Sequence, residues 1–277
     1  MKENYLIIPD VHGRDFWKKD VYHVVENDEN TKIIFLGDYL DPYPYEWERN
    51  YELEYDAPDF RENALEVFKE IIDLKKRCPN QIILLLGNHD CGYIWDSVCS
   101  CRRDRVRYKE ISDLFNSNLY LFDLAYQTQI GDKKYLFTHA GVHKIWLSNV
   151  FDDNIKYDNI SDYLNNWLHL DNNELGKEYL LGMYSYFRGY IDHNYGSCIW
   201  SDVREWSSEL GNVEENKKLG FYQIFGHTQL ENEPIVRDSF ACLDVRRVFY
   251  LSDENKLLDP YHPTCEWEYD LMNLKKK

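Results

Sequence analysis

The sequence predicts an α/β fold, built as a layered sandwich that contains two sheets. Strands and helices alternate in the first half of the chain, and strands dominate the later part. A third observation is the aliphatic run at residues 81–87, which is typical of a strand buried on both faces and ends in a glycine. Asn88, His89 and Asp90 follow at once, at the end of the strand where open α/β sheets place their ligands.

The first half of the chain supplies most of the predicted alternation. Val21, Val24 and Val25 recur near helical spacing in one segment, and three cations end the second predicted helix, as suits the helix dipole. Strands are predicted at residues 4–10, 32–38 and 81–87, and helices at 15–26 and 60–77.

The second half contains more strands. Gly131-Asp132 between two alternating runs predicts a hairpin. The tail from residue 255 is polar, ends in three lysines and is expected to fray. Strands are predicted at residues 124–130, 133–139 and 221–226, a helix at 104–117, and two short antiparallel strands within 240–251.

Two segments interrupt the predicted sandwich. Residues 42–59 are rich in Tyr, Glu, Pro and Asp without a clear period, which predicts a loop or cap at the rim of the sheet. Residues 143–197 predict a mainly helical insertion. With no internal repeat and no linker, we expect residues 1–277 to form a single domain.

The composition limits the kinds of partner. The chain has 277 residues, 44% of them hydrophobic, which supports a substantial core, and its formal net charge is −17. Such an acidic protein is not expected to bind a nucleic-acid backbone, which needs a basic surface. An anionic substrate would need strong local positive charge, and metal ions can supply it.

The cysteines and the hydropathy pattern indicate a location. The seven cysteines are odd in number and scattered, which favours reduced thiols in the cytoplasm. The apolar run at the start is too short for a signal peptide, and none approaches the roughly 20 residues that span a bilayer. We therefore expect a soluble protein without a membrane partner, while its oligomeric state stays open.

Five predicted strands end in groups that bind metals or move protons. If the strands lie in neighbouring sheets, their ends meet in one pocket. Oxygen and nitrogen donors without thiolates suit manganese foremost, with iron or zinc as alternatives. Six such donors are too many for one open catalytic ion and suit two ions about 3.5–4 Å apart, bridged by one carboxylate. The five strand ends are Asp10-Val11-His12, Gly37-Asp38, Gly87-Asn88-His89-Asp90, Thr138-His139 and Gly226-His227.

Two ions explain how so acidic a chain handles a phosphate ester. Bound ions neutralise phosphate oxygens and lower the pKa of a bridging water until it is hydroxide near neutral pH. The leaving oxygen still needs a proton. His89 can donate it if a carboxylate orients the ring.

The ordered motifs resemble those of the calcineurin-like metallophosphoesterase superfamily. The form Gly37-Asp38-Tyr39-Leu40-Asp41, the single histidine of the last motif and Trp200-Ser201-Asp202 are similar to its phosphoprotein-phosphatase branch, which includes serine/threonine phosphatases and symmetrical dinucleoside tetraphosphatases. Together the motifs span residues 10–228. The superfamily motifs are Asp10-x-His12-Gly13, Gly37-Asp38-Tyr39-Leu40-Asp41, Gly87-Asn88-His89-Asp90, His139-Ala140-Gly141 and Gly226-His227.

The resemblance implies a four-layer α/β/β/α sandwich and a role for each matching residue. His89 would be the general acid, paired with Asp41. The alternatives are a hydrogen-bonding role for His89 and a simple turn role for Asp41 before Pro42, while Asp90 is expected to cap the following helix. For the metals, Asp10 and His12 would bind the first ion, Asp38 would bridge, and Asn88, His139 and His227 would bind the second.

The sequence departs from this branch at the residues that hold the phosphate. Pro42 follows Asp41 where the branch carries an arginine, and Cys91-Gly92 stand where a second arginine is expected. Another cation must then contact the phosphate. Arg14 and Arg204 are the leading candidates, with Arg188 a third, and the alternative for Arg14 and Arg204 is an ordinary surface ion pair.

The predicted activity is that of a dinuclear-metal phosphomonoesterase whose substrate is a phosphoprotein or a small phosphorylated metabolite. Dinucleoside polyphosphate hydrolysis is the alternative, because the aromatic residues of 42–59 and 179–206 can stack on bases. The net charge disfavours a nuclease. A catalytically inactive binding scaffold is the alternative of another class, but such a protein would be expected to have lost ligands or the acid histidine, which this chain retains.

Overall fold

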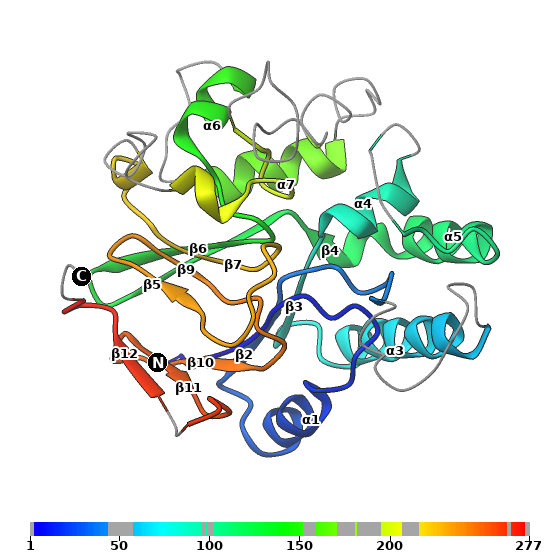
Figure 1. Ribbon diagram of the computed structural model, residues 1–277, viewed down its shortest axis with the longest axis horizontal. Coiled ribbons are helices and arrows are strands. Elements are labelled where there is room, and N and C mark those ends of the chain that lie inside the picture. Colours follow the sequence, from blue (N-terminus) through cyan, green and yellow to red (C-terminus); the bar gives the residue numbers. More distant parts are fainter. Residues whose placement is uncertain are drawn as a thin grey trace.

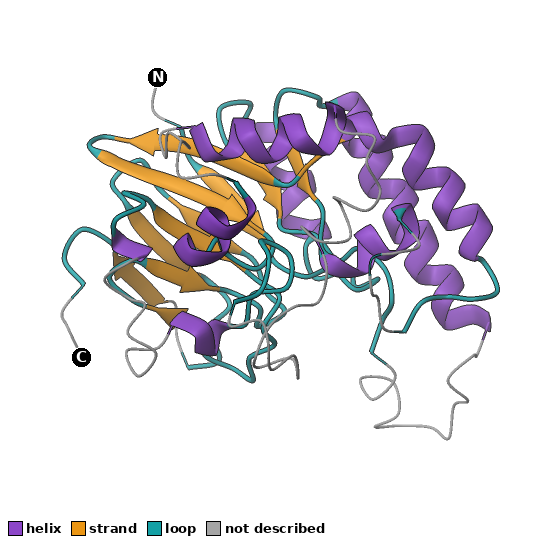
Figure 2. Cartoon of the chain, turned by 90° about the horizontal axis from the view of Figure 1, so that it is seen from above, coloured by secondary structure: helices purple, strands orange, loops and turns teal. Residues whose placement is uncertain are grey.

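Two β-sheets face each other at the centre of the molecule, with helices outside both (Figure 1). The computed structural model describes residues 3–43, 58–95, 98, 102–151, 159–170, 181, 195–206, 216–264 and 267–274. Figure 1 shows α1 and α3 on one outer side and α6 and α7 on the other, and Figure 2 shows the two sheets stacked. The predicted four-layer α/β/β/α sandwich is confirmed.

The first sheet has seven strands in the order β12-β11-β10-β1-β2-β3-β4. Strands β1 to β4 run parallel, while β10, β11 and β12 add an antiparallel edge next to β1. Its strands are β1 (Tyr5–Ile8), β2 (Lys32–Phe35), β3 (Ile82–Leu85), β4 (Phe122–Asp123), β10 (Phe249–Leu251), β11 (Lys256–Asp259) and β12 (Trp267–Asp270).

The second sheet has five strands in the order β5-β6-β7-β9-β8. Strands β6, β7 and β9 run parallel, and the hairpin of β5 and β6 turns at Gly131, whose φ of 57° suits a glycine. Its strands are β5 (Ala125–Ile130), β6 (Lys133–Thr138), β7 (Tyr222–Phe225), β8 (Ile235–Val236) and β9 (Phe240–Cys242).

The central strands are buried on both faces, which explains their continuous aliphatic runs. In β1, Tyr5 and Ile7 belong to the core between the sheets, whereas Leu6 and Ile8 belong to the core beneath the helices. Residues alternate between faces because the side-chain period of a strand is two. Each central strand therefore contributes to two cores at once, which holds the carboxyl ends of the strands firmly in place.

The helices cover the sheets through their apolar stripes. Val21 and Val24 of α1 and Phe68 of α3 join the core beneath the first sheet. On the second sheet, Asn165 of α7 bonds the backbone of Ala125 through its side chain. The helices are α1 (Lys18–Asn27), α3 (Pro58–Arg77), α4 (Asn88–Ile94), α5 (Tyr108–Asn118), α6 (Lys144–Val150) and α7 (Ile160–Leu170), with short 3₁₀ turns η1 (Leu119–Leu121) and η4 (Val203–Trp206).

Two predictions for the end of the chain are wrong. The two short strands within residues 240–251 do not pair with each other, because the chain crosses between the sheets: β9 runs parallel to β7, and β10 runs antiparallel to β1. The described part of the polar tail is ordered and contains β11 and β12. It is held by the buried Leu257 and by the ion pair of Arg247 with the buried Asp259, at 2.7 Å.

The two predicted insertions lie largely outside the described residues. Residues 44–57 fall outside, as do most residues between 171 and 194, whereas α6 and α7 confirm helices within 143–170. The single-domain organisation stays a prediction. Within the described part of the chain, no helix is both long and apolar enough to cross a membrane.

Candidate metal centre and active site

The five predicted strand ends meet at one edge of the sandwich. Asp10 follows β1, Asp38 follows β2 and Asn88 follows β3, all in the first sheet. In the second sheet, His139 follows β6 and His227 follows β7, and these two strands are parallel. The ion-pair and hydrogen-bond distances below bring all of these side chains together. Each of the following is at most 8% exposed: Asp10, His12, Asp38, Asp41, Asn88, His89, His139 and His227.

Two buried histidines have their tautomers fixed by backbone carbonyls. Nδ1 of His12 lies 2.8 Å from the carbonyl oxygen of Leu40, and Nδ1 of His139 lies 2.9 Å from that of Leu36. A carbonyl oxygen only accepts, so in both rings Nδ1 carries the proton and donates it. In the neutral form of each ring Nε2 then presents a lone pair, as in histidines that bind metals.

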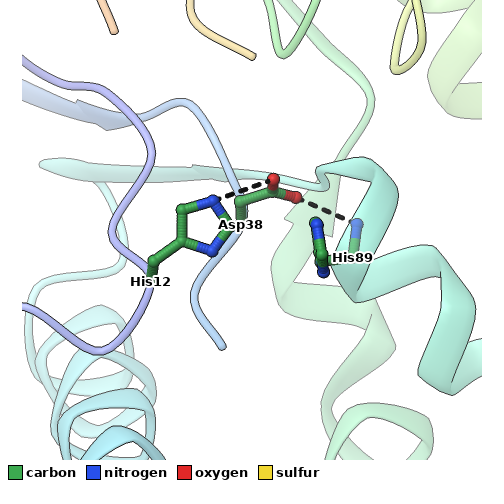
Figure 3. A group of neighbouring side chains, drawn as sticks. All are labelled: His12, Asp38 and His89. Carbon is green, nitrogen blue, oxygen red and sulfur yellow. Dashed lines mark hydrogen bonds and ion pairs between the residues drawn. The ribbon is translucent and has the colours of Figure 1, made fainter. Parts of the chain in front are cut away.

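Asp38 stands between these two lone pairs. Its Oδ2 atom is 3.5 Å from Nε2 of His12 and 3.5 Å from Nε2 of His139. Figure 3 shows Asp38 between His12 and His89, with its second oxygen accepting a hydrogen bond from the His89 backbone N–H. A carboxylate oxygen and two unprotonated nitrogens repel one another, so the arrangement suits cations among them.

More electron-pair donors converge on the His139 side. Nε2 of His139 lies 3.0 Å from Oδ1 of Asn88 and 3.1 Å from Nδ1 of His227. Asp38, His139 and His227 have ligand atoms within 4.8 Å of one another, as do His12, Asp38 and His89. The described residues thus include two candidate metal-binding groups that share Asp38.

The glycines of two motifs make room for the carboxylates. A Cβ atom on Gly87 would overlap Oδ1 of Asp38, and one on Gly226 would overlap Oδ1 of Asp10. Because glycine has no Cβ atom, the backbone comes close enough to bond these oxygens. His227 N–H donates to Asp10 at 2.9 Å, and His89 N–H donates to Asp38 at 3.0 Å. The glycines are therefore required by close approach.

Strained backbone is concentrated at the site. Seven non-glycine residues in the described ranges have positive φ, and four of them belong to the predicted site. Such conformations persist only where the surroundings hold them, and they cluster at functional sites. The four are His12 (46°), Asp38 (53°), Asp41 (58°) and His227 (64°).

Asp90 holds two of the motif loops together. Its carboxylate accepts from the backbone N–H groups of Asp38 at 2.7 Å, Gly87 at 2.8 Å and Tyr39 at 3.1 Å. The bond from Gly87, the N-cap residue of α4, agrees with the expected capping role. The other two bonds tie the loop after β2 to the loop after β3, and so fix the backbone of Asp38.

Burial and mutual charge shift the pKa values of the cluster. Burial raises the pKa of Asp10, and burial lowers that of His12 well below its usual value. Burial also acts to raise the pKa of Asp38, but the neighbouring His139, His89 and His12 outweigh it and lower this pKa to about 2. The lowered pKa keeps Asp38 ionised, which is the state that divalent ions require of a carboxylate ligand.

His89 and Asp41 form a hydrogen-bonded pair beside the metal cluster. Nδ1 of His89 lies 2.8 Å from Oδ2 of Asp41, whose other oxygen accepts from the Tyr93 hydroxyl at 2.5 Å. That hydroxyl in turn accepts from the backbone N–H of Asp104 at 2.6 Å. Asp41 is thus held from two sides and sets the orientation of the His89 ring.

The arginines proposed from sequence lie in different settings. Arg14 is half-buried, donates to the carbonyl oxygen of Asp10 at 3.2 Å and lies beside Tyr43. The side chain of Arg204 is 58% exposed and forms a two-pronged ion pair with Asp202, both bonds at 2.8 Å. Arg188 lies outside the described residues.

Arg102 and Asp244 belong to the site, but the sequence analysis did not identify them. Arg102 places Nη2 3.4 Å from Nε2 of His89, and its guanidinium stacks on the ring of Tyr43. Its sequence signal is a basic run at residues 102–109 in an acidic chain. Asp244 is 3% exposed, and burial followed by the charge of Asp10 raises its pKa. Asp244 follows the parallel strand β9, so the strand-end rule extended to β9 would have found it.

The fold and the donor set together define a metallophosphoesterase-like protein. The profile described as calcineurin-like phosphoesterase matches residues 4–230, and the chain therefore belongs to this family. Membership confirms the resemblance inferred from the motifs.

Individual relatives agree with this family. The catalytic subunit of serine/threonine-protein phosphatase 6 of Caenorhabditis elegans is 27% identical over 146 residues, which cover 53% of this chain and 30% of that protein. The chain thus matches about a third of the length of that curated relative.

Two solved structures share the fold. A cold-active protein-tyrosine phosphatase of a psychrophilic Shewanella species aligns with a TM-score of 0.56 and 15% identity, covering 96% of this chain and 80% of that one. A Saccharomyces cerevisiae serine/threonine phosphatase with similarity to human phosphatase PP5 aligns with a TM-score of 0.53 and 13% identity, covering 99% and 81%. At these identities the likeness concerns the fold alone.

Proposed function

We propose that the protein is a dinuclear-metal phosphomonoesterase whose substrate is a phosphoprotein or a small phosphorylated metabolite. One observation carries the proposal: Oδ2 of Asp38 lies 3.5 Å from Nε2 of both His12 and His139, and both rings have Nδ1 bonded to a carbonyl oxygen. A carboxylate placed equally between two fixed lone pairs is suited to bridge two cations.

The donors divide between the two ions around Asp38. Asp10 and His12 would hold one ion, and Asn88, His139 and His227 the other. Bound divalent ions neutralise phosphate oxygens and lower the pKa of water, which generates a nucleophile near neutral pH. The oxygen and nitrogen donors favour manganese, with iron or zinc as alternatives. The buried carboxylates of Asp10, Asp38 and Asp244 support this assignment, because cations would offset their repulsion.

His89 is assigned as the general acid rather than as a ligand, although its ring lies near His12 and Asp38. Its Nδ1 is engaged by Asp41 at 2.8 Å, and its Nε2 faces Arg102 at 3.4 Å. The Asp41 carboxylate stabilises the protonated ring and orients Nε2 toward the leaving oxygen. His89 then delivers its Nε2 proton to that oxygen as the phosphorus–oxygen bond breaks.

The free cysteines indicate the cellular compartment of the protein. Cys78, Cys91, Cys198 and Cys242 are free cysteines, which supports a reducing compartment, and the cytoplasm is the proposed location. Residues 1–277 are proposed as one domain, with a cap or insertion at 42–59 and a mainly helical insertion at about 143–197.

A substrate panel tests the proposed function. Purified protein is stripped of metal, reloaded with manganese, and assayed on a phosphopeptide, an aryl monoester, an aryl diester and a dinucleoside tetraphosphate, while bound metal is counted by elemental analysis. We expect two ions per chain and turnover of the monoesters well above that of the diester. Preferred cleavage of the tetraphosphate would move the assignment to a dinucleoside polyphosphate hydrolase. Metal binding without turnover of any substrate would indicate a scaffold and overturn the proposal.

A further inference from the structure

The proposed reaction needs a cation on the side of the phosphate that the metals do not contact. The two motif positions at which the phosphatase branch carries an arginine hold Pro42 and Cys91-Gly92 here. Cys91 is fully buried and uncharged, so it cannot serve. The chain therefore needs a positive charge from elsewhere, near the His89 ring.

Arg102 is placed where this charge is needed. Its Nη2 atom lies 3.4 Å from Nε2 of His89, the nitrogen assigned to protonate the leaving oxygen. Nε and Nη2 of Arg102 also donate to the backbone carbonyl of Asp41, at 3.4 and 3.2 Å. An oxygen of the phosphoryl group whose leaving oxygen meets His89 would thus lie within reach of the guanidinium.

The Tyr43 ring packs against the guanidinium of Arg102. The Arg102 Cζ atom is 3.7 Å from the centroid of the Tyr43 ring, a close cation–π contact. The same ring meets His12 edge-on at 4.8 Å, so the stack is anchored to a metal-ligand candidate. Arg14 reaches the same ring at 5.8 Å, which places a second positive charge nearby.

The backbone of Arg102 has a strained conformation at this position. Its φ is 57°, a conformation that is strained for a non-glycine residue. It belongs to the same small group of positive-φ residues as His12, Asp38, Asp41 and His227. Strained residues persist where surrounding contacts hold them, and here those contacts are made to the site itself.

We propose that Arg102, stacked on Tyr43, is the substrate-phosphate residue of this enzyme and replaces the arginines that the motifs lack. This inference rests on the proposed phosphomonoesterase function. A guanidinium fork pairs with two oxygens of one phosphate. A monoester dianion offers more charged, unesterified oxygens than a diester, so Arg102 favours monoesters over diesters.

The test compares Arg102→Gln with Arg105→Gln, a matched loss of charge three residues away on an exposed side chain. The measurements are the inhibition constant of inorganic phosphate, KM and kcat for an aryl monoester and an aryl diester, and bound manganese. We expect Arg102→Gln to raise the phosphate inhibition constant and the monoester KM about 10- to 100-fold, to change the diester KM less, and to leave manganese content unchanged. Arg105→Gln should stay within about twofold of wild type.

Two outcomes would overturn the inference. One is a phosphate inhibition constant within twofold of wild type in Arg102→Gln. The other is a fall in kcat alone for every ester, which would mean that Arg102 acts only by positioning Asp41 and His89. Either would leave the proposed function standing if the wild-type enzyme hydrolyses monoesters.

A second variant keeps the test decisive if Arg102→Gln does not fold. Arg102→Lys retains the charge and the alkyl stem over Tyr43 but loses the fork. We expect a severalfold weaker phosphate inhibition for Arg102→Lys, whereas unchanged inhibition would show that the fork has no contact with phosphate. Failure of the wild-type protein to hydrolyse any phosphate ester would instead defeat the proposed function itself.

Discussion

The metal cluster and the phosphate-facing rim of the site are built in different ways. Each metal-ligand candidate follows within a few residues of a β-strand and is buried. The rim residues Tyr43, Arg102 and Arg14 come from loops and are half-buried. Ligand positions depend on a backbone fixed to fractions of an ångström, which strand ends provide.

This difference explains why the residues of the metal cluster occupy the motif positions of the family, whereas the residues of the rim do not. A carboxylate or imidazole has a short reach, so its position along the chain is tied to its place in the fold. A guanidinium on a long stem can reach one site from several loops, and phosphate recognition can therefore move to another segment without a change of fold. Substitutions in the cluster should accordingly have larger effects than those in the rim.

The largest effect is expected at the centre of the cluster. Asp38→Asn removes the charge that the two proposed ions share, so bound metal and activity should fall together. Because metal stabilisation of the transition state contributes several kcal/mol, we expect a loss of roughly a thousandfold or more in kcat/KM. Elemental analysis and an aryl phosphate assay measure both quantities. Asp132→Asn, in the exposed turn of the β5–β6 hairpin, is the control.

The assignment of Asp38 has a definite opposite outcome. If Asp38→Asn kept both two ions per chain and wild-type turnover, Asp38 would not bridge the ions. Substitutions in the metal cluster would then not have larger effects than substitutions in the rim.

The next effect separates proton transfer from metal binding. His89→Asn should keep bound metal and lower kcat about 100- to 10,000-fold for a phosphate ester with a poor leaving group. A nitrophenyl ester, whose leaving oxygen needs little protonation, should be affected much less. Single-turnover assays on an alkyl and a nitrophenyl monoester measure the ratio. Equal slowing of the two esters, or loss of metal, would instead support His89 as a ligand.

Sequence reasoning anticipated the cluster because its signal is local. A polar residue directly after a buried aliphatic run is visible in the chain, and five such positions converge in the fold. The four-layer order of the sandwich needed the family resemblance, since periodicity alone does not say how two sheets stack. The strand pairing at residues 240–251 was missed because the short strands β9 and β10 belong to different sheets.

The rim could not be anticipated in the same way. Arg102 is one of several cations at residues 102–109, and nothing in that run distinguishes the one that meets His89. The contact depends on a positive φ and on Tyr43, which comes from a segment almost sixty residues earlier. Long-range packing determines which of these arginines contacts His89, and the composition of the segment does not predict it.

A smaller effect distinguishes the two arginines selected from sequence. Arg14→Gln should raise the KM of a phosphate monoester severalfold, because Arg14 lies beside Asp10 and Tyr43. Arg204→Gln should leave KM within about twofold, because the exposed Arg204 side chain pairs with Asp202. It should lower the melting temperature, since the buried Asp202 carboxylate loses its two-pronged ion pair with the Arg204 guanidinium. A larger KM change in Arg204→Gln than in Arg14→Gln would reverse this assignment.

The last effect is on stability and leaves activity aside, and it concerns a buried histidine that lies outside both regions. His143 is fully buried, caps α6 by accepting from the backbone N–H of Ile145, and stacks on Tyr195 at 3.8 Å. Burial lowers the pKa of His143 from its usual 6.5 to about 3. Burial accounts for this shift in the pKa of His143, whereas the charge of Asp38 partly opposes the effect of burial on the pKa of His12. His143 thus shows what burial alone does to an imidazole.

The folded state therefore holds His143 neutral, and only unfolding allows it to take up a proton below pH 6.5. Its contribution to stability is complete above that pH and is lost as the pH falls toward 3. Over the interval from pH 7.5 to 5, the loss is about 2 kcal/mol in the free energy of unfolding. His143→Asn keeps a helix-capping side chain without the titration, so metal-free His143→Asn should lose about 2 kcal/mol less than metal-free wild type over this interval. Urea unfolding at the two pH values measures the difference, and equal losses in the two proteins would show that His143 is not held neutral by the fold.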